Sequence, residues 1–257
     1  MDLHRPKAAH SWPEFAIEIG TIICGILIAL AFEQVVEALR WRGEVAETRR
    51  RLSVELGTLM GQAEFRARAS VCVQRRLDEL AAVVDDAARS GRLPTLGEPS
   101  YPSLFIWGTG AWQSAVRAQA LTHLNQGELR GYSDAYKFIG VVDESNRSEA
   151  KVWTALYGLA GPGRPFDAAQ AAAAREAIGE ARYLDSYIGG MGVRAHQFLD
   201  AYGIGFATRR YQKVLSRPIA SLPICKPIAG PPPLHYGAAP YRTFIADAHA
   251  HPMQPQL

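Results

Sequence analysis

Residues 15–32 read FAIEIGTIICGILIALAF, and this stretch decides the architecture of the chain. Glu18 is its only charged residue, and the apolar character continues to Val36. A helix of about 22 residues, at about 1.5 Å per residue, spans a hydrocarbon core about 30 Å thick. The stretch therefore predicts a single transmembrane helix over residues 14–36, with the lipid bilayer as its first partner.

Two other interpretations of the segment stay open. Arg5 and Lys7 give it a charged start, and residues 29–31 (Ala-Leu-Ala) resemble the small-residue site of a cleaved signal peptide. A segment of this composition is also compatible with the core helix of a soluble protein. Helical character continues without a break through Glu33 and beyond, which favours a retained anchor.

Small residues recur every fourth position within the segment, in two stripes. Small side chains allow two helices to approach closely in lipid, so the stripes predict a homo-oligomer or docking onto another membrane protein. The alternative is that small residues are simply common in membrane helices. The stripes are Ala16, Gly20 and Cys24, and Thr21, Gly25 and Ala29.

Residues 14–22 (EFAIEIGTI) and 25–31 (GILIALA), followed by Trp41 and an Arg/Glu-rich helix, resemble a family of uncharacterised bacterial membrane proteins. This family is a domain of unknown function with an N-terminal E-I-x-x-I-x-x-G-I-L-I-A-L anchor. The resemblance covers about residues 12–60 and implies a single-span bacterial membrane protein, with no activity and no site residues to carry over. Members often place Asn and Trp directly after the anchor, where this chain has Glu33 and Gln34.

Beyond the anchor, apolar residues recur at helical spacing and no alternating strand pattern occurs, which predicts an all-α fold. We expect the membrane helix to continue into a long stalk helix that packs in a bundle of about four to five helices. Asp167 is the expected N-cap of the last helix. The expected helices cover residues 33–89, 111–125, 128–159 and 168–202, the last interrupted at Gly189, Gly190 and Gly192.

Glycine and proline mark the remaining connections. The loop from Gly91 to Gly110 contains an apolar patch at residues 104–107 that is expected to tuck into the core. From Gly203 onward the chain is expected to be an extended, Pro-rich tail, partly disordered after about residue 230. The resulting division is an N-terminal flank (1–13), a transmembrane helix (14–36), a helical bundle domain (37–229) and a tail (230–257).

The cysteines bear on the compartment. Cys24 falls inside the apolar segment, which leaves Cys72 and Cys225 as the pair in the bundle domain. A disulfide between them would staple the C-terminal segment onto the bundle and would require an oxidising compartment, here a bacterial periplasm. Two unrelated buried thiols are the alternative, and a catalytic Cys72 lacks a suitably spaced His partner.

The charges that flank the apolar segment favour a cytoplasmic location of the bundle instead. Five arginines follow the apolar segment against Arg5 and Lys7 before it, and the positive-inside rule would then place the bundle in the cytoplasm. Several Glu residues accompany these arginines, and the rule is weak for long domains. The sequence therefore favours a single-pass protein of the bacterial inner membrane with a periplasmic rather than a cytoplasmic bundle. The five arginines are Arg40, Arg42, Arg49, Arg50 and Arg51.

Motifs for chemistry are missing from the sequence. The net charge of +3 is too small to predict a nucleic-acid partner. His249 and His251 lack the accompanying ligands of a metal site, and His123 and His196 are isolated on helices. The glycine-rich runs at 161–163 and 189–192 follow helices, so they do not predict phosphate binding. We therefore expect no cofactor and no metal, and a protein that is not an enzyme.

Two function classes remain. The first is a membrane-anchored structural or interaction protein, such as a scaffold or accessory subunit. The alternative is a membrane-tethered sensory or ligand-binding bundle, because helices of a bundle can enclose a ligand. Five aromatic residues would line such a pocket unless they fill the core: Trp107, Trp112, Tyr132, Tyr136 and Trp153.

Overall fold

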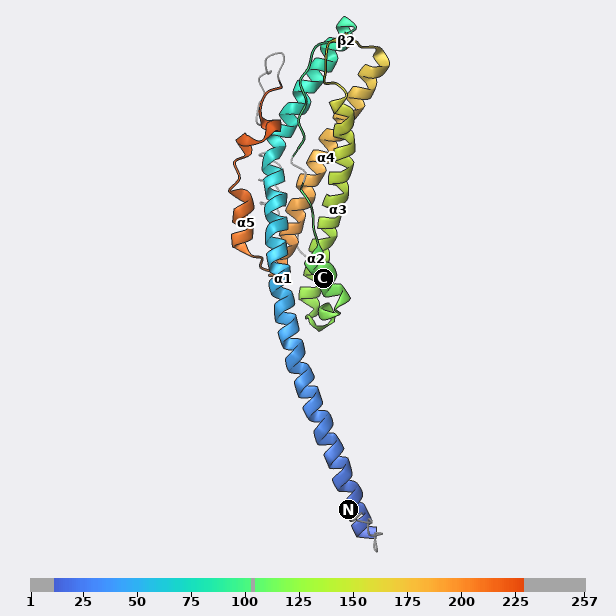
Figure 1. Ribbon diagram of the computed structural model, residues 1–257, viewed down its shortest axis with the longest axis vertical. Coiled ribbons are helices and arrows are strands. Elements are labelled where there is room, and N and C mark those ends of the chain that lie inside the picture. The colour runs from blue at the N-terminus through green and yellow to red at the C-terminus, as the bar shows by residue number, and fades with distance from the viewer. Residues whose placement is uncertain (1–11, 103–104, 229–257) are drawn as a thin grey trace, which may run out of the picture. The chain divides into compact units, whose positions relative to one another are not determined.

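The computed structural model describes residues 12–102 and 105–228 and has an all-α fold, as the sequence predicts. The chain divides into two units, residues 1–48 and residues 49–257. Helix α1 (Trp12–Ser90) runs through both and is 79 residues long. In the second unit, α1 lies beside α3 (Gln126–Tyr157) and α4 (Ala168–Ala201), as Figure 1 shows.

The core of the second unit follows from the spacing of apolar residues along these three helices. On α1, Leu77, Leu80 and Val84 recur at intervals of three and four residues, which places them on one face. They are fully buried, and they share one cluster with Trp153 of α3 and Ile178 of α4. Burying such a face stabilises the fold by about 1.5–3 kcal/mol per large side chain.

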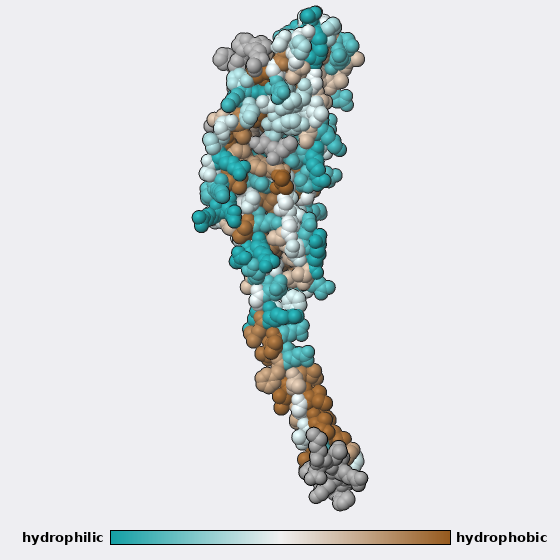
Figure 2. All heavy atoms as spheres, in the orientation of Figure 1, coloured by the Kyte–Doolittle hydropathy of each residue, from teal (hydrophilic) through white to brown (hydrophobic). Residues whose placement is uncertain are grey.

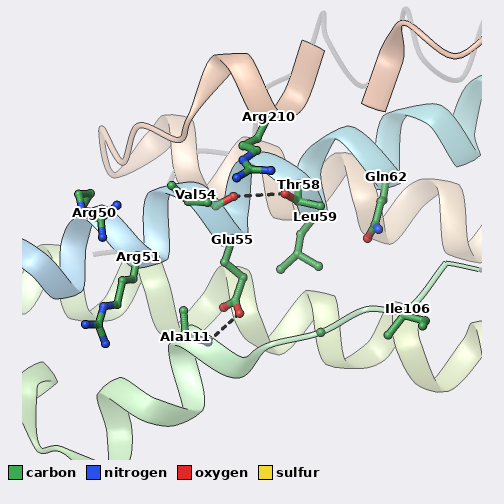
Figure 3. Close-up of a pocket in the computed structure, with 11 residues that line it drawn as sticks. Arg50, Arg51, Val54, Glu55, Thr58, Leu59, Gln62, Ile106, Ala111 and Arg210 are labelled. Carbon is green, nitrogen blue, oxygen red and sulfur yellow. Dashed lines mark hydrogen bonds between the residues drawn. The ribbon is translucent and has the colours of Figure 1, made fainter. Parts of the chain in front are cut away.

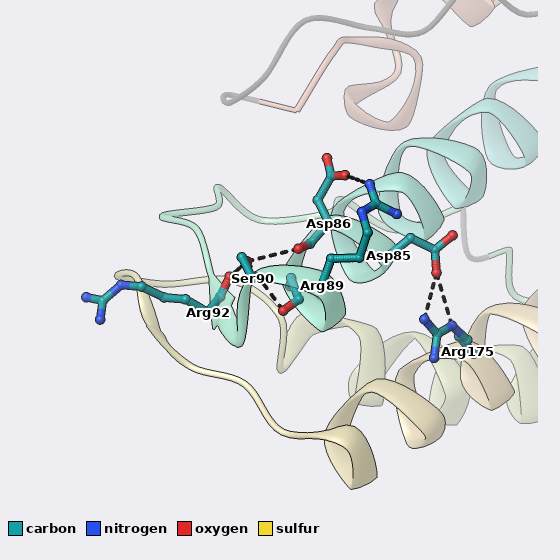
Figure 4. A network of polar contacts seen from close by, with 7 residues as sticks. Asp85, Asp86, Arg89, Ser90, Arg92 and Arg175 are labelled. Atoms are coloured by element: carbon teal, nitrogen blue, oxygen red, sulfur yellow. Dashed lines mark hydrogen bonds and ion pairs between the residues drawn. The ribbon is translucent and has the colours of Figure 1, made fainter.

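Helix α1 ends at Ser90, and the following Gly91 has a φ of +69°, the left-handed conformation typical of a residue after a helix. The Ser90 hydroxyl donates hydrogen bonds to the carbonyl oxygens of Asp86 at 2.9 Å and Arg92 at 3.2 Å (Figure 4). Nearby, Arg175 of α4 donates to Asp85 of α1 at 2.8 Å. Both side chains of this pair are half exposed, so it adds little stability.

Two very short strands, which the sequence did not predict, lie in the loops that follow α1 and precede α4. Strand β1 (Arg92–Leu93) pairs antiparallel with β2 (Arg164–Pro165), and Leu96 forms a bridge with Gly161. The predicted break at residues 161–163 is confirmed, since Gly161 has a φ of +118°. These pairings hold the α1–α2 loop against the α3–α4 loop.

The expected helix over residues 111–125 is wrong in its length. Helix α2 (Gly110–Arg117) is followed by a separate 3₁₀ turn, η1 (Ala120–His123). Gln119 between them has a φ of +56°, and a left-handed residue cannot continue a right-handed helix. Asn125 then caps α3 by accepting a hydrogen bond from the amide of Glu128 at 2.8 Å.

The expected interruption of α4 is also wrong. The helix begins at the predicted cap Asp167, which forms a capping box with Gln170, and continues unbroken to Ala201. A Cβ at Gly192 would lie 2.9 Å from the Cβ of Ala63. The glycine therefore permits close packing of α4 on α1, and this packing outweighs the low helix propensity of glycine.

The segment after Gly203 is not simply extended, contrary to expectation. It forms helix α5 (Thr208–Leu215) and the 3₁₀ turns η2 (Ile219–Ser221) and η3 (Pro223–Cys225). Glycines on α1 permit close contact, because a Cβ at Gly57 would lie 2.5 Å from the carbonyl oxygen of Ala207. The expected tail of residues 230–257 lies outside the described residues.

Candidate functional site

The apolar segment of α1 is the first candidate, considered within the first unit alone. Among the described residues, one helix is long and apolar enough to cross a membrane, and none of its most apolar 18-residue window is buried. Hydrophobic residues gather along the N-terminal part of α1 in Figure 2. Ile17, Leu27 and Phe32 expose more than half of their surface. Such exposure is unfavourable in water and is expected in lipid.

The residues of both small-residue stripes lie on the surface of this segment. Cβ atoms built at Gly20 and Gly25 would meet no atom within 4 Å. Cys24 is exposed and carries a free thiol. Because Gly20 and Gly25 are five residues apart, the centres of the two stripes lie about 140° apart around the helix. The stripes Ala16–Gly20–Cys24 and Thr21–Gly25–Ala29 therefore form two different faces.

A disulfide joins Cys72 of α1 to Cys225 of η3, as predicted, across a sequence separation of 153 residues. It holds η3 against the bundle, where Ile224 is fully buried. The pairing also rules out Cys72 as a thiol nucleophile in this form, because both sulfur atoms are committed to the bond.

Two consecutive arginines reinforce the same junction. Arg75 donates to the carbonyl oxygen of Cys225, and Arg76 donates to the carbonyl oxygens of Pro99 and Lys226. The guanidinium of Arg76 is buried and also pairs with Glu79 at 3.0 Å. Burial lowers the pKa of Arg76, in part offset by Glu79. These contacts attach the α1–α2 loop and the C-terminal segment to the C-terminal part of α1.

A buried ionic cluster, which no motif in the sequence predicts, lies deeper in the bundle. Arg66 of α1 donates to Asp185 of α4 at 2.5 Å and to Glu149 of α3 at 2.6 Å. All three side chains are at most 1% exposed. Asp185 also accepts hydrogen bonds from Ser70 and Gln74, each at 2.5 Å. The cluster therefore links all three long helices through charged groups.

The cluster holds two carboxyl groups and one guanidinium, which is one negative charge in excess if both carboxyls are ionised. Burial and the charge of Asp185 together raise the pKa of Glu149 to about 7, against the opposing effect of Arg66. Burial alone would lower the pKa of Arg66, but the two carboxylates raise it above its usual value. Glu149 therefore holds a proton at mildly acidic pH. This property is compatible with a structural role, because all three side chains are buried between the helices.

A pocket of about 570 Å³ opens on the surface of the second unit, between α1, α5 and the segment that leads into α2 (Figure 3). Arg50, Arg51 and Arg210 line it together with one carboxylate, that of Glu55. Its remaining lining consists of Val54, Thr58, Leu59, Gln62, Ile106, Gly108 and Ala111.

The aromatic residues considered for a ligand pocket do not line this one. Trp107, Tyr132, Tyr136 and Trp153 are buried in the core. Trp112 stacks on Tyr136 with ring centroids 4.7 Å apart, and the hydroxyl of Tyr136 donates to Glu55 at 2.7 Å. Of the apolar patch at 104–107, Trp107 is buried as expected, whereas Ile106 is 89% exposed at the pocket.

Metal ligation finds no support in the described part of the chain, where no group of three or more His, Cys, Asp or Glu side chains is arranged to hold an ion. His196 contacts Asp200 at 3.0 Å within α4. His249 and His251 lie outside the described residues. Comparisons of the chain with protein-family models, with curated proteins and with solved structures find no match.

Proposed function

We propose that this chain is a membrane-anchored structural or interaction protein without enzymatic activity. One observation carries the proposal: an apolar helical segment long enough to cross a bilayer whose side chains are exposed rather than packed in the protein. Two separate faces of small residues on the same segment support contact with other membrane helices. The segment would then anchor the bundle and place it beside a second copy of the chain or another membrane protein.

The compartment is part of the proposal. The Cys72–Cys225 disulfide supports an oxidising environment, and the family resemblance of the anchor supports a bacterial inner membrane. The bundle would then lie in the periplasm, despite the arginines that follow the anchor. The positive-inside rule applies to short loops, and it weakens for a domain of this size.

Thiol labelling of spheroplasts tests the compartment. A membrane-impermeant maleimide is expected to label Cys72 and Cys225 only after treatment with an impermeant reductant, with no need for lysis. The Cys24→Ser variant keeps only these two thiols and simplifies the readout. Labelling that requires lysis but no reductant would place the bundle in the cytoplasm and reject the periplasmic assignment.

Cys24 also provides a direct test of helix pairing. If two copies meet along the Ala16–Gly20–Cys24 face, mild oxidation of native membranes should cross-link Cys24 into a dimer. The second face is probed by Gly25→Cys in a Cys24→Ala background, and Ile26→Cys in that background is a control between the faces. Cross-linking at one face above the control supports self-association.

The remaining outcome concerns a different partner. If neither face cross-links to itself, the protein should co-purify with another membrane protein, and Gly20→Leu or Gly25→Leu should abolish that association. Recovery of the wild-type chain only as a detergent-stable monomer, with no partner and no cross-link, would exclude an interaction role for the anchor.

A further inference from the structure

We propose that the pocket between α1, α5 and the start of α2 binds a phosphate ester, either a free one or the headgroup of an anionic lipid. The inference goes beyond the anchoring role. Binding of a free ester does not depend on that role, because every residue of the pocket belongs to the second unit, whereas binding of a lipid headgroup rests on it. Its volume of about 570 Å³ falls within the usual range for small-molecule sites.

The charge of the lining selects an anion. Arg50, Arg51 and Arg210 contribute three positive charges against one negative charge from Glu55. Arginine carries several donors in a planar fork that matches phosphate oxygens, and it stays protonated at any physiological pH. Arg50 and Arg51 also interact within the chain.

The Glu55 carboxylate is already committed to the protein. It accepts hydrogen bonds from the amides of Ala111 at 2.7 Å and Trp112 at 3.2 Å, and from the hydroxyl of Tyr136 at 2.7 Å. Figure 3 shows its carboxylate turned toward Ala111, away from Arg210 on the other side of α1. Glu55 therefore stabilises the first turn of α2, and its charge is directed away from Arg210.

The rest of the lining mixes apolar and polar side chains. Val54, Leu59 and Ile106 line the pocket together with Thr58 and Gln62. Apolar side chains suit the carbon skeleton of a small ester, and a few polar groups suit its hydroxyls. Phosphate esters of glycerol or of a sugar combine these features with the anion that the arginines select.

The two sources of this chemistry can be separated with the full chain in nanodiscs. In phosphatidylcholine nanodiscs, glycerol 3-phosphate is titrated calorimetrically at fixed ionic strength. In a second arm, the melting temperature of the bundle is compared between phosphatidylglycerol and phosphatidylcholine nanodiscs. Binding in the first arm identifies a free ester, and a higher melting temperature in phosphatidylglycerol without calorimetric binding identifies a lipid headgroup.

Adjacent residues of α5 supply matched variants. Arg210 lines the pocket and Arg209 does not, and both are exposed, so Arg210→Gln and Arg209→Gln remove the same charge. Arg210→Gln is expected to weaken glycerol 3-phosphate binding about tenfold or more, or to abolish the lipid-dependent shift, since a charge-assisted hydrogen bond is lost. Arg209→Gln should change either readout less than about twofold, because an exposed charge outside the lining makes no hydrogen bond to the anion and is screened by salt.

Arg51→Gln is the second pocket variant and should behave like Arg210→Gln. The proposal is overturned if the wild type responds in neither arm, or if Arg209→Gln reduces the response as much as Arg210→Gln and Arg51→Gln do. The latter result would mean that the anion is attracted by the general charge of the surface rather than by this pocket.

Discussion

The Nη2 atom of Arg66 lies 2.6 Å from Oε1 of Glu149, and the side chains are 1% and 0% exposed. Removing one partner of an ion pair that is buried this deeply is strongly destabilising, because the remaining charges are left without compensation. We expect Arg66→Met to lower the free energy of unfolding by about 3–5 kcal/mol. Urea unfolding of the full chain in detergent micelles measures this change.

The control for this prediction lies two residues away on the same helix. Arg68 pairs with Glu64 at the surface, where both side chains are more than a third exposed. Arg68→Met should cost less than about 1 kcal/mol. The triple variant Arg66→Met, Glu149→Gln, Asp185→Asn should recover much of the loss, because it leaves no buried charge. A cost of Arg66→Met no greater than that of Arg68→Met would refute a stabilising role for the cluster.

The same cluster predicts a dependence of stability on pH. Burial raises the pKa of Glu149 to about 7 in the folded chain, whereas the unfolded value is 4.5. Between these values the folded state binds the proton and the unfolded state does not. The contribution of Glu149 to stability is therefore fully present below pH 4.5 and is lost as the pH rises through 7. The integrated effect is about 3 kcal/mol at most.

Glu149→Gln isolates this contribution, since the amide stays neutral and its oxygen can still accept from Arg66. The difference in unfolding free energy between this variant and the wild type should grow in favour of the variant from pH 5 to pH 8. Glu144→Gln, an exposed position on the same helix, serves as the control. A difference that stays constant over that range would mean that Glu149 titrates normally.

The disulfide predicts a large and specific response to reductant. In the chain-entropy model, closing a loop of 153 residues contributes as much as about 5 kcal/mol. Cys72→Ser and Cys225→Ser should each lower the melting temperature to that of the reduced wild type, and Cys24→Ser should not change it. If reduction leaves the melting temperature of the wild type unchanged, the bond does not constrain the unfolded chain as proposed.

The periodic spacing of apolar residues was sufficient to predict the long helices. The spacing of Leu77, Leu80 and Val84 identifies the buried face of α1 without any partner, and Asp167 is a recognisable cap. The errors have a common cause in tertiary packing. From the sequence alone, Gly192 predicts a break in α4, but it packs against Ala63 within a continuous helix. Likewise, α5 is stabilised by contacts with a distant part of α1 that local propensity does not record.

The candidate sites were likewise predictable only where they did not depend on contacts between distant residues. Elimination of Cys24 leaves Cys72 and Cys225 as one pair, so the disulfide could be predicted by counting. Arg66 and Asp185 are 119 residues apart, and nothing in either local sequence distinguishes them from surface charges. Arg210 and Arg50 meet at one pocket only because α5 returns to α1. Long-range juxtaposition of this kind requires a structure.

The contact of α5 with α1 gives the last prediction. A Cβ at Gly57 would lie 2.5 Å from the carbonyl oxygen of Ala207, and backbone cannot yield as a flexible side chain can. Gly57→Ala should therefore displace the start of α5, lower the free energy of unfolding by about 1–3 kcal/mol and speed hydrogen exchange of residues 208–215. Gly140→Ala on α3 is the matched control, because its Cβ would meet no atom within 4 Å. Alanine has the higher helix propensity, so that variant should gain about 0.5–1 kcal/mol. If Gly57→Ala is instead stabilising like Gly140→Ala, α5 does not pack closely on α1. The pocket that Arg210 lines would then not form.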